Sequence, residues 1–127
     1  MKIRWMEQVV RFRITPTELS DLIVGNSVQE ELSMLGGKWT AQIDPNVLES
    51  GLEMQGNCCI CSLSASDLLL LSAPDSEGVY FEERYGQEIR FYIEKDFPCV
   101  HPRASEAPEL TKETFNPPVG FEARKAP

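Results

Sequence analysis

The chain has 127 residues, of which 42% are apolar and 9% aromatic, so it can bury one hydrophobic core and is not intrinsically disordered. Its 20 acidic and 12 basic side chains give a net charge of −8, which opposes sequence-independent binding to nucleic acid. The apolar run Leu68–Leu71 is far below the roughly 20 residues that cross a bilayer, and residues 1–12 do not resemble a signal peptide. We therefore expect a cytoplasmic protein with neither nucleic acid nor membrane as a partner.

The first segment of the chain predicts two strands and a short helix. Apolar and polar residues alternate along residues 3–14, as they do in strands with one buried face. The apolar members of this pattern are Ile3, Trp5, Val10, Phe12 and Ile14. Thr15 followed by Pro16 and Glu18 is a helix-start signal, because the hydroxyl and the carboxylate can accept hydrogen bonds from free backbone N–H groups. The apolar stripe within Leu19–Ile23 predicts a helix that ends at Gly25-Asn26.

A hairpin follows, and then the same order of elements recurs 49 residues later. Alternating segments at Val28–Leu35 and Lys38–Asp44 flank Gly36-Gly37, which predicts the hairpin. The alternation of the second half then resumes at Leu52, Met54, Cys59, Cys61 and Leu63. Ser64 to Asp67 repeats the helix-start signal, and the second helix runs from Ala65 to about Ser72. A second hairpin is predicted from Val79–Tyr85 and Gln87–Glu94 around Gly86.

Each half therefore has the predicted order β-β-α-β-β. We expect an α+β fold of two duplicated units, with about eight strands in a curved antiparallel sheet or barrel and two short helices. A sheet of this size can also split into two layers, and the sequence does not choose among these arrangements. The units span about residues 2–45 and 51–97 of a single domain, residues 1–100. Six of the nine prolines lie from residue 98 onward, so residues 101–127 are expected to be an irregular tail. Its apolar residues that can dock on the domain are Phe115, Val119 and Phe121.

Four cysteines and the single histidine are candidates for a metal or redox site. They are Cys58, Cys59, Cys61, Cys99 and His101. Cys59 and Cys61 occupy the positions that Val10 and Phe12 have in the first half, on the buried face of a strand, so we interpret them as core thiols and expect no cofactor. The alternative, a site made by Cys59, Cys61, Cys99 and His101, requires the Cys99 segment to fold back onto the Cys59 strand.

Basic and aromatic residues gather on the polar side of the predicted strands. Arg11 and Arg13 lie opposite the apolar face of one strand, and Arg90 and Tyr92 lie opposite the apolar face of the last strand. On a concave sheet these guanidinium groups can bind a phosphate or carboxylate through paired hydrogen bonds. The alternative is a solvated face on which arginines and glutamates pair across strands.

Familiar catalytic patterns are absent from the sequence. It contains no G-x-G-x-x-G, no G-x-x-x-x-G-K-[ST], no H-E-x-x-H and no second histidine. Glu94 and Asp96 lie close in sequence, but alternation predicts a solvent-exposed strand end for them. We therefore expect a small acidic binding or interaction module without catalytic activity, associating with itself or another protein through an edge strand or an apolar surface. A binding protein or enzyme for a small anion is the alternative, and a Cys/His site is the second alternative.

Two resemblances accompany these patterns. The segments Lys2–Arg4, Val10–Thr15 and Ile93–Cys99, with Phe115–Pro117, resemble an uncharacterised family of small bacterial proteins, which implies a soluble protein and no assigned site. The order of elements also resembles, at the level of the fold, the tunnel-fold triphosphatases and class IV adenylate cyclases, in which duplicated units close an eight-stranded barrel. Members of that superfamily carry alternating acidic residues on the first strand, whereas Lys2–Glu7 has one, so the resemblance does not extend to their activity.

Overall fold

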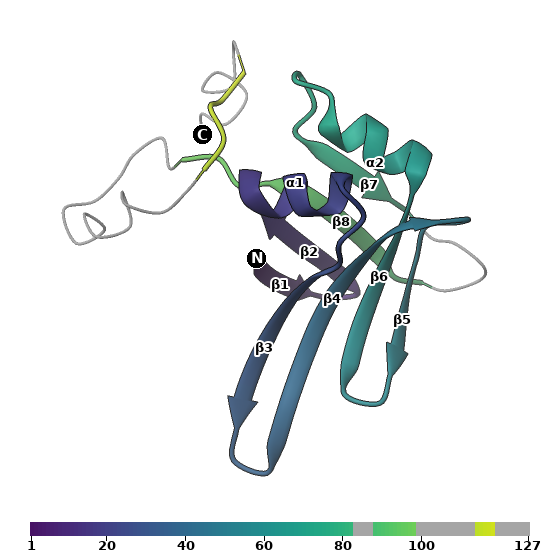
Figure 1. The fold of residues 1–127 in the computed structure, drawn as a ribbon. Coiled ribbons are helices and arrows are strands. Elements are labelled where there is room, and N and C mark those ends of the chain that lie inside the picture. The colour runs from purple at the N-terminus through teal and green to yellow at the C-terminus, as the bar shows by residue number, and fades with distance from the viewer. Residues whose placement is uncertain (83–87, 99–113, 119–127) are drawn as a thin grey trace, which may run out of the picture.

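The computed structural model describes residues 1–82, 88–98 and 114–118, which form two four-stranded sheets and two short helices (Figure 1). The elements are β1 (Lys2–Met6), β2 (Val9–Ile14), α1 (Pro16–Ile23), β3 (Val28–Met34), β4 (Gly37–Val47), β5 (Gly51–Gln55), β6 (Cys58–Ser64), α2 (Ala65–Ser72), β7 (Gly78–Phe81) and β8 (Arg90–Lys95). The predicted α+β class and the two short helices are confirmed. In the described part of the chain, no helix is long and apolar enough to cross a membrane.

The strands are divided between two mixed sheets. Sheet A has the order β1-β2-β8-β7, and sheet B has the order β3-β4-β6-β5. Each hairpin is antiparallel, but the central pairs β2–β8 and β4–β6 are parallel. The expected antiparallel pairing is therefore wrong for the central pairs, and the described strands form two layers, which was one of the open arrangements, rather than a closed barrel. Turn signals report only pairing between neighbours in sequence, whereas each central pair joins a strand of one half to a strand of the other.

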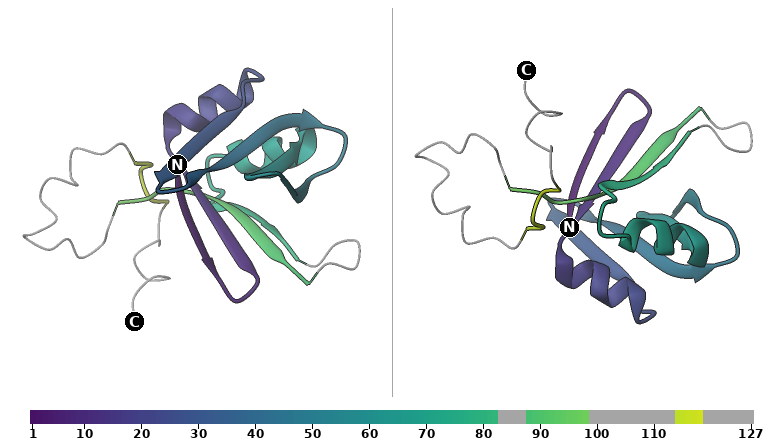
Figure 2. Two further views of the ribbon diagram at one scale, coloured as in Figure 1. Left: turned by 90° about the horizontal axis from the view of Figure 1, so that it is seen from below. Right: turned by 90° about the horizontal axis from the view of Figure 1, so that it is seen from above.

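Each half of the chain contributes one hairpin to each sheet. The β1–β2 and β3–β4 hairpins of the first half lie in sheets A and B, and the β5–β6 and β7–β8 hairpins of the second half lie in sheets B and A. Both helices lie at one end of the sheets, and the β3–β4 and β5–β6 hairpins project from the other end (Figure 1). The views along the strands show the two sheets facing each other at an angle (Figure 2).

The core lies between the sheets at the helical end. Its fully buried side chains include Phe12, Ile14, Leu22, Ile43, Cys61, Leu63, Leu71 and Ile93. The interpretation of Cys59 and Cys61 as core thiols is confirmed, since both are buried in this cluster. Burial, with the neighbouring thiol as a smaller cause, raises the pKa of both cysteines.

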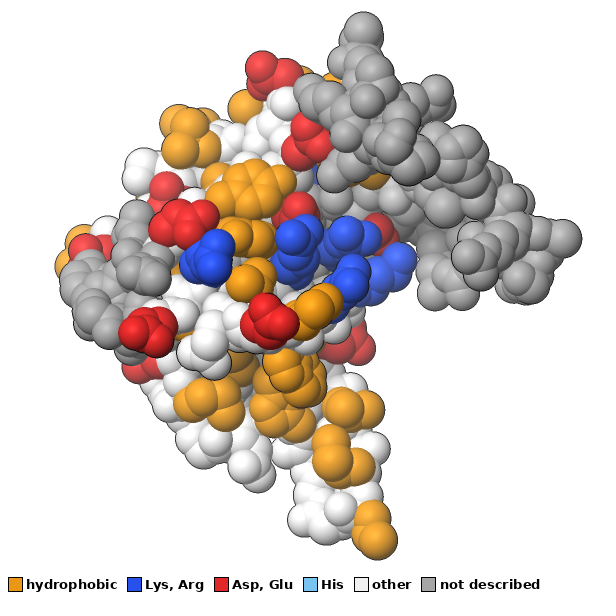
Figure 3. All heavy atoms as spheres, turned by 180° about the vertical axis from the view of Figure 1, so that it is seen from behind, with side chains coloured by type: hydrophobic (Ala, Val, Ile, Leu, Met, Phe, Trp, Pro, Cys, Tyr) orange, Lys and Arg blue, Asp and Glu red, His pale blue; other side chains and the backbone are white. Residues whose placement is uncertain are grey.

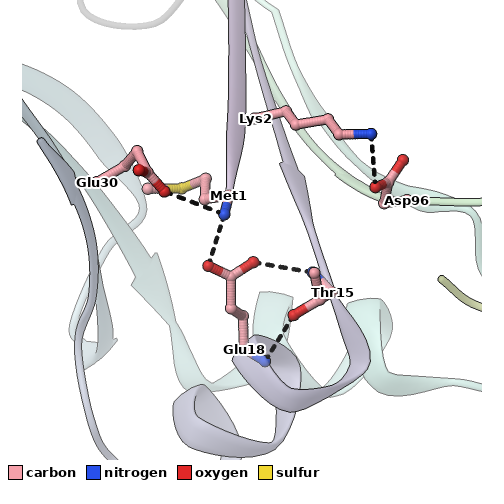
Figure 4. A network of polar contacts seen from close by, with 6 residues as sticks. All are labelled: Met1, Lys2, Thr15, Glu18, Glu30 and Asp96. Atoms are coloured by element: carbon pink, nitrogen blue, oxygen red, sulfur yellow. Dashed lines mark hydrogen bonds and ion pairs between the residues drawn. The ribbon is translucent and has the colours of Figure 1, made fainter. Parts of the chain in front are cut away.

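The predicted start of α1 is confirmed in detail. The Thr15 hydroxyl accepts a hydrogen bond from the Glu18 N–H at 3.2 Å, and Glu18 Oε1 accepts one from the Thr15 N–H at 2.9 Å. The second oxygen of Glu18 accepts a hydrogen bond from the Met1 amine at 2.8 Å, and Glu30 lies 3.3 Å from the same amine (Figure 4). Burial lowers the pKa of this amine, but the hydrogen bonds and charges of Glu18 and Glu30 outweigh that effect and raise it. Glu18 thus connects the helix cap to the start of β1.

The start of α2 uses the same positions with different groups. Ser64 accepts a hydrogen bond from the Asp67 N–H at 3.2 Å, but Asp67 is one methylene shorter than glutamate. The Ser50 hydroxyl therefore bridges the cap: it accepts a hydrogen bond from the Ser64 N–H at 2.8 Å and donates one to Asp67 Oδ2. Ser50 and Asp67 each lie 49 residues after Met1 and Glu18, so both halves connect the residue before the first strand to the helix cap.

The end of β8 is more enclosed than expected. Glu94 and Asp96 are buried rather than exposed, because neighbours from other elements cover them. Lys2 forms an ion pair with Asp96 at 3.1 Å (Figure 4), and the Phe115 N–H donates to the Asp96 carbonyl at 2.8 Å. Phe115 therefore docks on the domain, as predicted. Val119, Phe121 and the Gly86 turn lie outside the described residues.

Candidate functional site

An apolar groove lies between the sheets at the end away from the helices. Its volume is about 470 Å³, and we call it the inter-sheet groove. Its lining, apolar except for one glutamate, is Ile3, Trp5, Val10, Trp39, Leu52, Glu53, Met54, Cys59 and Ile89. Side chains of both sheets thus face a space that no other described side chain fills.

The lining residues come in pairs from the two halves of the chain. Ile3 and Leu52, Trp5 and Met54, and Val10 and Cys59 are each 49 residues apart. Their strand registers also correspond, since Trp5 pairs with Val10 in sheet A and Met54 pairs with Cys59 in sheet B. The groove therefore lies where the β1–β2 and β5–β6 hairpins face each other.

The mouth of the groove is formed by large apolar side chains that remain accessible to solvent. Trp5 is 71% exposed and Met54 is 57% exposed, although alternation directs both toward the groove. Trp5 and Trp39 lie with their rings 6.3 Å apart and inclined by 45°. Exposed tryptophan and methionine side chains are typical of surfaces that bind other molecules.

A second hollow continues from the groove along the free edge of β1. Its volume is about 710 Å³, and we call it the edge hollow. It shares Ile3, Trp5 and Trp39 with the inter-sheet groove and extends over the β3–β4 hairpin to Met34 and Leu35. Figure 3 shows hydrophobic side chains along the projecting hairpin, below a group of basic side chains.

The outward side of sheet A carries that basic group, which we call the basic face. Its members on β1 and β2 are Lys2, Arg4, Arg11 and Arg13, and Arg90 of β8 lies on the same side of the sheet. Strand register places Lys2 directly opposite Arg13 and Arg4 directly opposite Arg11. Like charges in such positions repel each other, so this arrangement lowers stability unless an anion lies nearby.

One buried carboxylate lies within the basic face. Glu94 Oε1 is 3.5 Å from Arg11 Nη1 and 4.0 Å from Arg13 Nε, yet this buried oxygen accepts no hydrogen bond. The other oxygen, Oε2, accepts a hydrogen bond from the Tyr80 hydroxyl at 3.3 Å. Burial, followed by the negative charge of Glu94, raises the pKa of Tyr80 to about 12.

The structure brings three of the four predicted ligand-binding residues together. Arg11 lies over the Tyr92 ring, with its guanidinium carbon 5.3 Å from the ring centre, and Arg13 lies on the same face. Arg90 belongs to the same face, but its guanidinium pairs with Glu82 at 3.7 Å. The expected cross-strand pairing of arginine with glutamate is therefore present, and the role of these residues in binding an anion stays a prediction.

The cysteines form no metal site within the described residues. In that part of the chain, no three His, Cys, Asp or Glu side chains are grouped so that they can hold a metal ion. Cys59 and Cys61 face the core, while Cys99 and His101 lie outside the described residues. The alternative Cys/His site stays a prediction.

Sequence reasoning missed the groove residues Trp5, Trp39 and Met54, which it treated as ordinary strand positions. One signal was available. The 49-residue offset pairs Trp5 with Met54, and both lie next to the hairpin turns, at the strand ends farthest from the helix caps. Large apolar residues at those paired positions lie at the end of the sheets that the helices do not cover, so the sequence could have predicted an uncovered apolar surface there.

Comparisons with known proteins identify a family but no activity. A family model described as a family of unknown function matches residues 1–118, which is nearly the whole chain. Neither the curated proteins nor the solved structures contain a significant match, so the fold-level resemblance to tunnel-fold enzymes has no support from a known structure. The resemblance to an uncharacterised family is confirmed: the chain belongs to DUF7009, a family of unknown function.

Proposed function

We propose that this protein is a non-catalytic binding module that receives apolar side chains of a partner protein in the inter-sheet groove. The observation that carries the proposal is the exposure of Trp5 and Met54 at the mouth of a groove lined by paired apolar residues. Burying such side chains against a partner removes apolar surface from water and stabilises the complex.

The surroundings of the groove favour a protein segment over a small molecule. The groove is continuous with the edge hollow, and the hollow is bordered by β1 and β3, the outermost strands of their sheets on that side. An outermost strand presents backbone N–H and C=O groups that a second polypeptide can pair with. A protein segment can therefore use both the apolar lining and the backbone beside it.

The titratable groups of the groove support binding rather than catalysis. Glu53 and Cys59 are the ionisable side chains in its lining. Burial raises the pKa of Cys59, which keeps the thiol protonated, and a protonated thiol is a poor nucleophile.

The test is selection of short peptides from a displayed random library, followed by affinity measurement through tryptophan emission. Both tryptophans of the chain line the groove, so their emission reports directly on its occupancy. Selected peptides are expected to shift the emission and to bind Met54→Arg at least about tenfold more weakly. Leu69→Arg is the matched control, because Leu69 is an exposed apolar residue on α2. Peptides that bind both variants as tightly as the wild type would contradict the proposal.

A second candidate function is recognition of a small phosphate or carboxylate by Arg11 and Arg13 beside Tyr92. The facing pairs of like charges on the basic face favour it, because a bound anion would relieve their repulsion. Titration with inorganic phosphate and with citrate, followed by calorimetry, is expected to show binding that Arg13→Gln weakens. Arg90→Gln is the control, because Glu82 already pairs with Arg90. Equal heats for wild type and Arg13→Gln would exclude this site.

We also infer that the fold consists of two duplicated units. The starts of β5, β6 and α2 follow those of β1, β2 and α1 by 49 residues, and the order of strands in sheet A corresponds to that in sheet B when the halves are exchanged. The groove would then lie on the pseudo-twofold axis between the units, which accounts for its paired lining.

A further inference from the structure

The outer edge of β1 has space beside it. Among the described residues, β1 pairs with β2 alone, and the edge hollow lies between β1 and β3. The backbone groups on that edge of β1 are therefore accessible to an extended polypeptide, which would extend sheet A by one strand.

The two faces of β1 differ sharply in chemistry. Ile3 and Trp5 face the inter-sheet groove, whereas Lys2 and Arg4 lie on the basic face. Side chains of an added strand would alternate between the same two faces, and each would lie beside the β1 side chain on its own face. An added strand that complements both faces must therefore alternate apolar and acidic residues.

Arg4 is the basic residue that most needs such a partner. Lys2 already pairs with Asp96, and Arg11 and Arg13 share Glu94. Arg4 is exposed, forms no ion pair with any described residue and lies directly opposite Arg11. A carboxylate on a strand next to β1 would lie beside Arg4 and reduce this repulsion.

The other outermost strands, β3, β5 and β7, do not combine a groove-facing apolar side with a basic opposite side. Neither β3 nor β5 carries a basic side chain, and β5 carries Glu53 in the groove lining. Glu30 and Glu31 of β3 also line the edge hollow, but Glu30 pairs there with the Met1 amine at 3.3 Å and Glu31 pairs with Lys38 at 3.5 Å. The four-residue β7 carries the exposed Tyr80 and no basic residue.

We propose that β1 is a docking edge for an extended segment of a partner protein whose side chains alternate between apolar and acidic. The proposal rests on the proposed function, since the apolar half of the segment occupies the groove beside Ile3 and Trp5. It adds the backbone edge and the charge pattern that select the partner.

The probe is a synthetic peptide of about seven residues, the length of a typical strand, with alternating valine and glutamate. A peptide of the same composition in two blocks tests the alternation, and a valine–lysine peptide tests the charge. Titration followed by tryptophan emission is expected to show binding of the alternating acidic peptide, weaker or absent binding of the other two, and loss of affinity as salt rises.

Two charge-reversing variants locate the site. Arg4→Glu is expected to weaken binding of the alternating peptide by about tenfold or more. Arg90→Glu changes the net charge equally and lies on the same sheet, but away from β1, so it should leave the affinity nearly unchanged. Equal binding of the blocked peptide, or equal loss in both variants, would overturn the proposal.

The outcome separates this inference from the proposed function. If library peptides lose affinity for Met54→Arg while the alternating peptide fails to bind, the groove remains a binding site and docking at β1 is wrong. If library peptides bind Met54→Arg as tightly as the wild type, and the alternating peptide binds Arg4→Glu as tightly as the wild type, both proposals fail. Concentration-dependent self-association that the alternating peptide does not reverse would also overturn docking at β1, because a second copy would then occupy the edge.

Discussion

Gly78 is the residue at which a single added carbon would disturb the fold most directly. A Cβ at this position would lie 2.6 Å from the Ile93 carbonyl oxygen and 3.0 Å from the Glu94 Cα, and both are backbone atoms that cannot rotate away. We expect Gly78→Ala to lower the free energy of unfolding by roughly 1–3 kcal/mol, because the β7–β8 pair must move apart. Equilibrium unfolding in urea measures the change.

The control is Gly37→Ala at the start of β4. A Cβ there meets no atom within 4 Å, so the free energy of unfolding should change by about 0.5 kcal/mol or less. Similar losses in the two variants would show that close approach at Gly78 is not the cause.

Tyr80 and Glu94 form the second residue-scale case. Burial and the Glu94 charge raise the pKa of Tyr80 from 10.0 to about 12, so the folded protein holds this proton more tightly than the unfolded chain does. The stabilisation from this group is complete below pH 10 and is lost as the pH rises from about 10 to 12. Glu94→Gln removes the charge but keeps the burial, so we expect it to lower the pKa of Tyr80.

Tyrosinate absorbance recorded against pH measures this pKa, and Tyr80→Phe identifies which transition belongs to Tyr80. An unchanged transition in Glu94→Gln would show that the carboxylate does not contribute. A transition that remains in Tyr80→Phe would belong to another tyrosine.

At the scale of elements, Ser50 determines how α2 begins. Its hydroxyl is buried and links the Ser64 N–H to the Asp67 carboxylate. Ser50→Ala would leave both groups without this partner, and we expect a loss of about 1–3 kcal/mol in the free energy of unfolding. Urea denaturation measures it.

The cap of α1 suggests how to restore that loss. In α1, Glu18 reaches the Thr15 N–H directly at 2.9 Å without an intervening hydroxyl. Asp67→Glu in the Ser50→Ala background should therefore recover part of the stability, because the longer side chain can reach the Ser64 N–H. If the double variant is no more stable than Ser50→Ala, the two caps are not equivalent in the way proposed.

Local signals in the sequence predicted the elements well, because each signal lies within the element that it specifies. Thr15 and Ser64 located both helix starts, and glycine turns located the described β3–β4 hairpin. The parallel pairs β2–β8 and β4–β6 were missed, because they join distant strands and no turn connects them. The burial of Glu94 was missed for the same reason, since Tyr80 and Arg11 approach it from other strands.

At the scale of the whole molecule, charge is divided more sharply than the net value of −8 suggests. Residues 1–25 contain four basic and three acidic side chains, and all four basic residues belong to the basic face of sheet A. The negative total disfavours extended binding to nucleic acid, but it does not describe the surface around β1. A partner that meets β1 encounters positive charge on one side and an apolar groove on the other.

The division between core and groove can be tested with two aromatic residues of the same hairpin. Phe12 is fully buried between the sheets, whereas Trp5 is 71% exposed at the groove mouth. We expect Phe12→Ala to lower the free energy of unfolding by about 3–5 kcal/mol and Trp5→Ala to lower it by about 1 kcal/mol or less. Peptides selected for the groove should nevertheless lose most of their affinity for Trp5→Ala, measured through the emission of the remaining Trp39.

A loss of stability in Trp5→Ala as large as that in Phe12→Ala would mean that the groove is part of the core. A small loss of stability in Trp5→Ala together with a large loss of peptide affinity would mean that Trp5 serves binding, because its exposed side chain contributes little to folding and is buried only when a partner binds.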